Sequence, residues 1–257
     1  MAQIAHGYGS EFQLLRFLGH HRNLLEEEIC KQINVNKKHF YWLDFDFAKR
    51  ENVVSGDQER VGLRFLYELP MLSSEKTFVE EIINNFKQYK IGRSINSWQN
   101  WDAIFTLDKT IYLVEAKAYV KEMKSQPEEQ KTIGEIKRFM SDSLSEINIT
   151  DDWFGCYYQF ANRLATTSFL QKRLKSKGFS AKLLCMYFIN GNSKPILDEK
   201  QEKIIRMDET DHPNASKEDY KNAIKNEIEE LGLDKHEDLL SNLMCEVFIN
   251  ADPQKDK

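Results

Sequence analysis

Apolar residues recur at three- and four-residue intervals in five parts of the chain, which is the spacing of a helix with one buried face. The first of these helices is predicted to begin with Ser10 as its N-cap. The fourth is predicted to end before Gly178, and the fifth to begin at Ser216 and end at Gly232. The five predicted helices cover residues 10–29, 78–86, 133–147, 157–174 and 216–232.

Short runs of β-branched and aromatic residues predict strands between these helices. The runs Ala103–Leu107 and Ile111–Val114 are separated only by Asp108-Lys109-Thr110, which predicts a hairpin. The polar stretch Lys194–Ala215 is predicted to be a loop. This mixture indicates an α/β (α+β) fold, a single domain with a central mixed sheet flanked by helices. The other strands are predicted at residues 40–47, 63–69 (the partner of 40–47), 182–190 and 243–249.

Composition is that of an ordinary globular chain, with 257 residues, 41% hydrophobic and 30% charged. There is no run of 18 apolar residues, and the N-terminus lacks the basic and apolar order of a signal peptide, so we expect a cytoplasmic protein without membrane contact. The four cysteines lie far apart, which favours free thiols over disulfides or a metal knuckle. The net charge of −5 excludes a histone-like coat for nucleic acid but leaves a local basic groove open.

Three charged residues beside the predicted hairpin carry the candidate chemistry. Glu115 and Lys117 are two residues apart on one predicted strand, so their side chains leave the same face of the sheet. If the hairpin closes through the two-residue loop Asp108-Lys109, Asp102 lies directly opposite Glu115. A three-residue loop would place Asp102 opposite Ala116 instead.

Two opposed carboxylates at about 5 Å repel each other, and burying both is costly unless a cation lies between them. Oxygen ligands without a nearby Cys or His favour a hard ion, Mg²⁺ or Mn²⁺. Such an ion beside a lysine suits the attack of water on a phosphodiester. The metal offsets phosphate charge and lowers the pKa of bound water, while the ammonium orients that water.

The chain contains several tripeptides in which an acidic residue is followed, two positions later, by a lysine. Sequence context separates Glu115-Ala116-Lys117 from the others. Only Glu115-Ala116-Lys117 interrupts an apolar strand, where charges are costly, whereas the others lie in polar or helical sequence. The alternative interpretation of Asp102, Glu115 and Lys117 is a cross-strand salt bridge on an exposed hairpin face.

Asp102 and, after twelve intervening residues, Glu115-Ala116-Lys117 resemble the motif of the PD-(D/E)XK nuclease superfamily, home of restriction endonucleases and Holliday-junction resolvases. Trp101 stands where that motif has a proline. The resemblance implies that Asp102, Glu115 and the main-chain carbonyl of Ala116 bind Mg²⁺ (or Mn²⁺) and that Lys117 assists the attacking water.

The resemblance also implies a restriction-endonuclease-like sheet in which a helix and a further strand follow the motif. The predicted helix 157–174 and strand 182–190 meet this requirement, with residues 121–149 as an insertion. Residues 9–22 and 157–163 are similar to segments of uncharacterised bacterial proteins of this superfamily. The resulting organisation is a core over about residues 100–190, an N-terminal helix and strand region over 1–99, and a C-terminal helical extension over 191–257.

Members of this superfamily often add a glutamate from a helix. Glu11 is our preferred candidate, and Glu80 or Glu81 on the helix before the motif also qualify. The alternative for Glu11 is a first-turn charge that only favours its helix. Gln159 and Arg163 share one helix face, so they either reach a substrate phosphate or the lysine, or form an exposed polar face.

We therefore expect a Mg²⁺-dependent nuclease that hydrolyses phosphodiester bonds of DNA, in restriction or repair. The alternative is a catalytically inactive nuclease-fold protein that binds or docks a partner. A third interpretation is a metal-dependent hydrolase of a small phosphorylated molecule. The expected partners are nucleic acid, with DNA preferred over RNA, and either a second copy in a homodimer or a partner subunit.

Overall fold

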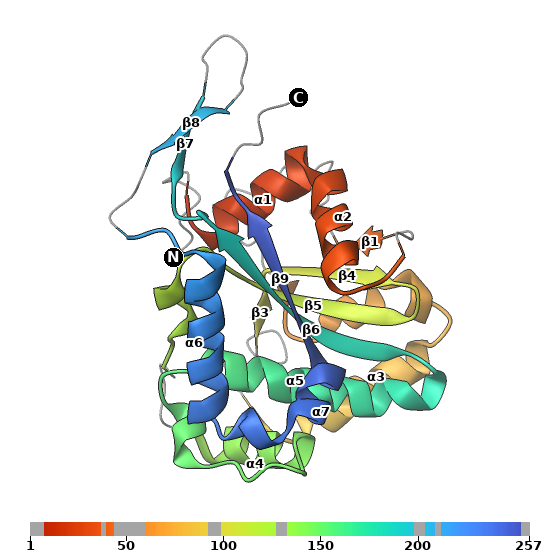
Figure 1. The fold of residues 1–257 in the computed structure, drawn as a ribbon. Coiled ribbons are helices and arrows are strands. Elements are labelled where there is room, and N and C mark those ends of the chain that lie inside the picture. Colours follow the sequence, from red (N-terminus) through yellow and green to blue (C-terminus); the bar gives the residue numbers. More distant parts are fainter. Residues whose placement is uncertain are drawn as a thin grey trace.

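A five-stranded mixed sheet forms the centre of the computed structural model (Figure 1). Each of its first three strands is antiparallel to its neighbour among them, and the last two strands run parallel to the third. This arrangement confirms the predicted α+β class, a central mixed sheet flanked by helices. The strands, in order across the sheet, are β1 (Phe40–Trp42), β4 (Ala103–Leu107), β5 (Thr110–Lys117), β6 (Ser180–Ile189) and β9 (Met244–Asn250). The structure describes residues 8–36, 40–43, 60–91, 99–126, 133–197, 204–208 and 212–252.

Helices cover both faces of the sheet. Side chains alternate between the two faces along each strand, and both faces carry apolar residues that the helices bury. α1 (Ser10–His20) and α2 (Arg22–Gln32) pack on the face that carries Val114. α5 (Tyr158–Leu174) packs on the opposite face, which carries Leu113. This helix connects β5 to its parallel neighbour β6, as parallel pairing requires a crossover.

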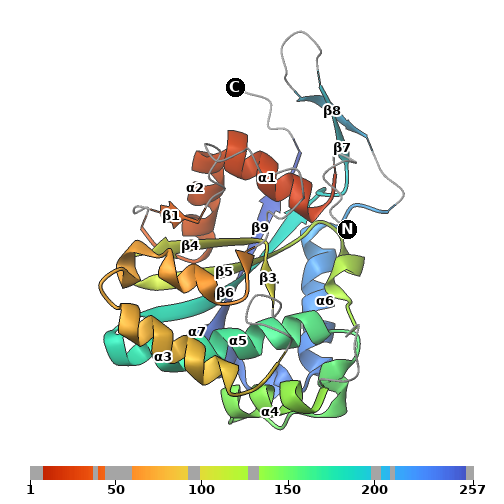
Figure 2. The same ribbon diagram turned by 180° about the vertical axis from the view of Figure 1, so that it is seen from behind.

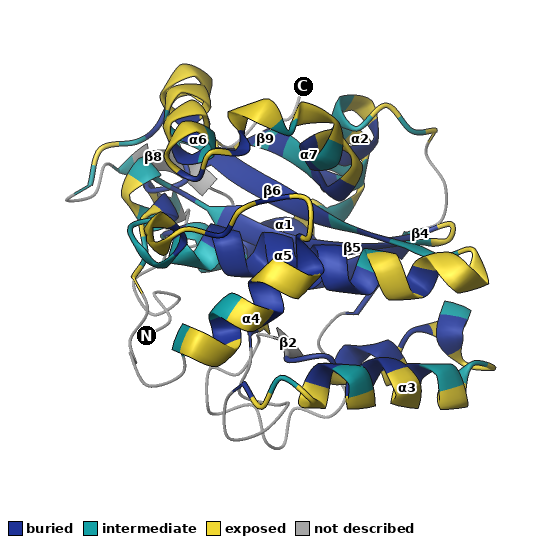
Figure 3. Cartoon of the chain, turned by 90° about the horizontal axis from the view of Figure 1, so that it is seen from below, coloured by how far each residue is buried: buried dark blue, intermediate teal, exposed yellow. Residues whose placement is uncertain are grey.

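α5 is itself enclosed on its outer side by two further helices (Figure 3). α3 (Lys76–Lys87) and α4 (Ile133–Ser143) place aromatic side chains against it. Phe86 packs edge to face on Phe139, with ring centroids 5.3 Å apart, and on Phe169 of α5 at 5.8 Å. Two shells of helices on this side of the sheet therefore keep polar side chains in the middle of α5, such as Asn162, Thr166 and Thr167, from solvent.

α6 (Lys217–Glu230) and α7 (Glu237–Leu243) complete the face of the sheet on which α5 lies (Figure 1). α6 begins with a capping box, in which Ser216 Oγ accepts the Asp219 N–H at 3.2 Å and the Asp219 carboxylate accepts the Ser216 N–H at 2.8 Å. A separate hairpin extends away from the body of the molecule (Figure 2). The minor elements are β2 (Arg60–Val61), β3 (Asn100–Trp101), the hairpin strands β7 (Lys194–Leu197) and β8 (Ile204–Asp208), and the 3₁₀ turns η3 (Arg64–Tyr67), η4 (Pro70–Leu72), η6 (Val120–Met123), η8 (Asp151–Phe154), η9 (Lys175–Lys177) and η10 (Leu233–Lys235).

Several local predictions were wrong. The first helix divides at His21 into α1 and α2, and its N-cap is Gly9, because the Ser10 hydroxyl donates instead to Glu122 at 3.2 Å. Residues 63–69 contain η3 rather than a strand, and β1 pairs with β4. The stretch 194–215 contains the β7–β8 hairpin. Residues 44–47 of the predicted strand lie outside the described residues.

Candidate active site

The hairpin register places the acidic pair as the two-residue loop predicts. Leu107 pairs with Thr110, and the ladder continues to Ala103 opposite Val114. Asp102 follows outside the strand, where its N–H donates to the Val114 carbonyl at 3.2 Å. Its carboxylate turns back toward β5 and accepts the N–H of Ala116 at 2.6 Å.

Glu115 and Lys117 lie at the end of β5 and face α5. Their side chains are only 8% and 13% exposed, so the alternative of an exposed hairpin face was wrong. The ammonium of Lys117 donates to Glu115 Oε1 at 2.6 Å and to Gln159 Oε1 at 2.9 Å. The strand and the helix therefore join in one buried polar network.

Arg163 is the second cation of this network. Its Nε donates to Glu115 Oε2, and its Nη2 donates to the carbonyl of Asn100 at 2.7 Å. The guanidinium also lies over the ring of Trp101, 5.4 Å from the centroid. Because Arg163 is 6% exposed, the alternative of an exposed polar face on α5 was wrong.

The network separates the protonation behaviour of its two carboxylates. Burial, reinforced by the charge of Glu115, raises the pKa of Asp102 to about 8. Burial also disfavours the charged form of Glu115, but Arg163 and Lys117 together hold its pKa below its ordinary value. The pKa of Lys117 is raised, because Glu115 and Asp102 outweigh the effect of its burial. Glu115 and Lys117 are thus charged near neutral pH, while Asp102 holds a proton.

The helix glutamates expected from the resemblance differ in their exposure. Glu80 and Glu81 are exposed on the outer side of α3, so their carboxylates point to solvent. Glu11 is half-buried in the first turn of α1, where its neighbour Ser10 donates to Glu122 of η6 at 3.2 Å. The exposed carboxylates of α3 are therefore not part of the buried network of β5, and Glu11 stays a prediction.

Two other glutamates, which the sequence analysis did not select, lie close to Lys117. Glu122 of η6 accepts the Ala118 N–H at 2.5 Å, and burial raises its pKa. Glu227 of α6 is 2% exposed, and burial raises its pKa to about 8. The sequence signal for Glu227 is its place in an apolar helical stripe with Ile224.

Glu227 and the β5 pair line one small cavity of about 20 Å³. A cavity needs roughly 10–15 Å³ to hold a water molecule, so this one admits a single water. The wall combines charged and polar side chains with apolar ones. The lining residues are Glu115, Lys117, Met123, Gln159, Phe160, Cys185, Tyr187 and Glu227.

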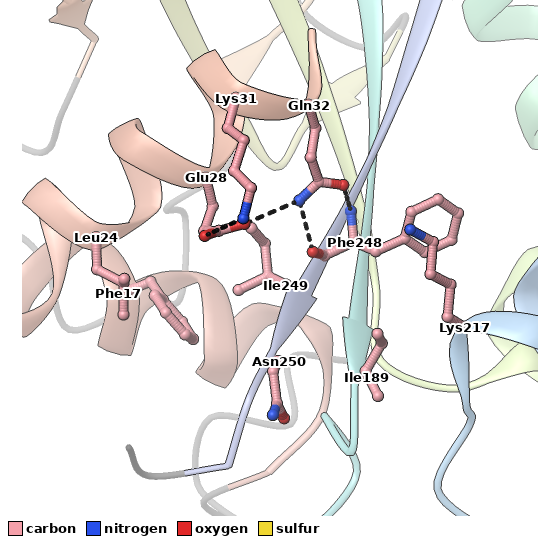
Figure 4. A pocket seen from close by; sticks show the side chains of 10 residues that line it. All are labelled: Phe17, Leu24, Glu28, Lys31, Gln32, Ile189, Lys217, Phe248, Ile249 and Asn250. Carbon is pink, nitrogen blue, oxygen red and sulfur yellow. Dashed lines mark hydrogen bonds and ion pairs between the residues drawn. The ribbon is translucent and has the colours of Figure 1, made fainter. Parts of the chain in front are cut away.

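A larger hollow of about 340 Å³ lies beside β9, the edge strand of the sheet, between the helices α1 and α2 and the start of α6 (Figure 4). Its walls include Phe17 of α1 and Lys217 at the start of α6. The side-chain amide of Gln32 crosses it and pairs with the main chain of Phe248, donating to the carbonyl at 2.8 Å and accepting from the N–H at 2.9 Å (Figure 4). Neither Glu115 nor Lys117 lines this hollow, so it is separate from the candidate active site.

The donor set at the hairpin suits a hard divalent ion. Asp102 and Glu115 supply carboxylate oxygens, and the carbonyl of Ala116 faces the same side as its N–H, toward Asp102. Both Glu115 oxygens, however, accept from cations. A bound metal would therefore share the Glu115 oxygens with these cations or displace one of them. In the described ranges, no three His, Cys, Asp or Glu side chains are already gathered as a metal cluster.

No family model, curated protein or solved structure matches the chain. Among the helices of the described residues, none is long and apolar enough to cross a membrane.

Proposed function

We propose that this chain is a divalent-metal-dependent nuclease of the PD-(D/E)XK type that hydrolyses phosphodiester bonds of DNA. One observation carries the proposal: the hairpin register brings Asp102 beside the end of β5, where Glu115 and Lys117 are buried in one polar network. Burial of this many charges is costly, and such costs are typical of catalytic sites.

The roles follow from the chemistry of each group. Asp102, Glu115 and the carbonyl of Ala116 would hold Mg²⁺ or Mn²⁺, which would offset phosphate charge and activate water. The Lys117 ammonium would orient the attacking water. Gln159 keeps that ammonium in place through its 2.9 Å hydrogen bond, and Arg163, once released from Glu115, supplies a guanidinium for a phosphate oxygen.

The order of elements supports the same proposal. A helix, α1, precedes the antiparallel strands β1, β4 and β5, and α5 then leads to the parallel strand β6. The resemblance implied a helix and a further strand after the motif. Fold alone does not establish an activity, so the weight remains on the residues of β5.

The test compares wild type with E115Q, which keeps the shape of the side chain. Plasmid and single-stranded DNA are incubated with each protein and Mg²⁺ or Mn²⁺, with EDTA as the metal-free control. We expect cleavage by the wild type, and its loss in E115Q and in EDTA. E246Q is the matched control, because Glu246 is a partly buried carboxylate on the same face of the sheet that does not line the cavity. Full metal-dependent cleavage by E115Q would refute the assignment.

A second candidate is a non-catalytic protein that uses the same scaffold to bind DNA or another partner. The observation that favours it is the ion pair of Arg163 with Glu115, which places a cation where a metal would otherwise bind. Calorimetric titration of Mg²⁺ and Mn²⁺ distinguishes the two candidates. DNA binding by a wild type that binds neither ion would favour this second candidate.

We also propose that the protein acts in the cytoplasm, where its four free cysteines would stay reduced. Recognition of a duplex would need a second copy or a partner subunit, because the basic residues Lys172 and Arg173 lie at the far end of α5. That end adjoins Thr110, and seven residue steps along β5 lead from Thr110 to Lys117, a span of about 23 Å.

A further inference from the structure

Glu227 occupies a position that its helix would ordinarily fill with an apolar residue. The buried face of α6 carries Tyr220, Ile224 and Glu227 at intervals of four and three residues, and Leu231 follows the helix. Glu227 is nonetheless 2% exposed. Burying a carboxyl group without a hydrogen-bonding partner costs several kcal/mol of free energy. Its burial therefore calls for a partner at the place where the side chain ends.

The face of α6 is held against the end of β5. The hydroxyl of Tyr220 donates to the carbonyl of Lys117 at 3.2 Å and to that of Phe188 at 3.3 Å. Two turns further along the helix, Glu227 reaches the cavity that Lys117 also lines. The anchored helix thus aims a carboxyl group at the ammonium of the candidate site.

The Lys117 ammonium has one N–H group left for a further acceptor. An ammonium carries three N–H groups, and those of Lys117 have two acceptors, Glu115 Oε1 and Gln159 Oε1. Within the described part of the chain, no ion pair joins Lys117 directly to Glu227. Their charges still interact, since Lys117 lowers the pKa of Glu227 against the larger effect of burial. The two groups are therefore close but separated by more than a direct contact.

The cavity between them has the volume and the partners that one water requires. Its volume of about 20 Å³ exceeds what one water needs. A water there has Lys117 as donor and the carboxyl of Glu227 as acceptor, and buried waters typically make about three hydrogen bonds. Glu115 and Gln159 also line the cavity, and either can supply the third hydrogen bond of such a water.

We propose that Glu227 is a positioning residue of the candidate site, which holds the ammonium of Lys117 through one water in this cavity. The inference rests on the proposed function, because it assigns Glu227 a part in the same reaction. Glu227 contacts neither the metal nor the substrate in this role. It fixes the direction of the remaining N–H of Lys117, which limits the rotation of the ammonium that serves the attacking water.

The structural arm of the test is a high-resolution crystal structure of the full-length wild type. We expect a water within about 3.2 Å of both Lys117 Nζ and a Glu227 oxygen. A dry cavity, or a water that contacts only one of the two groups, would overturn the proposal. This arm needs no activity and no variant, so it decides the point even if the chain cleaves nothing.

The kinetic arm compares E227L, E227Q and the control E246Q with wild type. E227L should lower kcat roughly ten- to hundredfold with little change in KM, because the ammonium is displaced rather than removed. E227Q should restore most of that rate, since an amide also bonds a water. Wild-type kcat in E227L would overturn the inference and leave the proposed nuclease intact. Absence of cleavage by the wild type would instead refute the proposed function.

Discussion

Replacing the buried carboxyl group of Glu227 by an amide is expected to flatten the pH dependence of the free energy of unfolding. Burial raises the pKa of Glu227 from 4.5 to about 8 in the folded protein. Between these two values the folded protein holds a proton that the unfolded chain has released, so stability falls as the pH rises. E227Q has no such proton and lacks this contribution.

The size of the effect follows from the same two pKa values. Each pH unit inside the window corresponds to about 1.4 kcal/mol. From about pH 5 to about pH 7, the wild type should therefore lose up to about 3 kcal/mol more than E227Q, and below about pH 4 the two curves should run parallel. Urea unfolding followed by tryptophan fluorescence measures this difference, because groups common to both proteins cancel.

The matched control is E230Q, since Glu230 is exposed on the same helix. Its unfolding free energy should stay within about 0.5 kcal/mol of wild type. Equal pH slopes for wild type and E227Q would refute the reasoning. A wild type that gains stability relative to E227Q as the pH rises would refute it as well.

Three further substitutions test the network around β5. K117M keeps the side-chain length without the charge, and its single-turnover rate of DNA cleavage should be roughly 100-fold lower or more. An unchanged rate would contradict the role of Lys117 in orienting the attacking water. D102N should weaken Mg²⁺ binding in calorimetry roughly 10- to 100-fold, and equal affinity would exclude Asp102 as a ligand. R163M leaves buried Glu115 with one cation instead of two, so urea unfolding should show a loss of about 3 kcal/mol. The exposed control R173M should lose less than about 0.5 kcal/mol, and a similarly small loss in R163M would show that the pair adds little.

The acidic pair could be predicted from the sequence because its geometry is local. A two-residue loop fixes the register of a hairpin, and counting back along both strands then brings Asp102 to Glu115. Asp108 has the left-handed φ of 53° that such a tight loop requires. The apolar strand around the motif marks its residues as buried. No information from distant parts of the chain is needed for either step.

The contribution of α6 to the site could not be predicted, because it depends on long-range packing. The stripe of Tyr220 and Ile224 shows that α6 has a buried face and that Glu227 belongs to it. Nothing in the spacing says that this face covers the end of β5, about a hundred residues earlier in the chain. For the same reason the sequence predicts a strand over residues 63–69, where the spacing of the apolar residues does not exclude the 3₁₀ turn that the structure has.

The charges of the site distinguish the two candidate functions. With Asp102 and Glu227 protonated near neutral pH, two cations, Lys117 and Arg163, face one carboxylate, Glu115, so these five groups carry a net positive charge. Such a site attracts a phosphodiester even though the whole chain is acidic, and it repels a divalent ion until Asp102 loses its proton. A nuclease must therefore bind Mg²⁺ more tightly when a DNA phosphate is present to offset the cations. A non-catalytic binding protein has no such requirement. Calorimetric titration of Mg²⁺ with and without an uncleavable duplex separates the two, because equal affinities would remove the electrostatic basis for a metal-dependent reaction at this site.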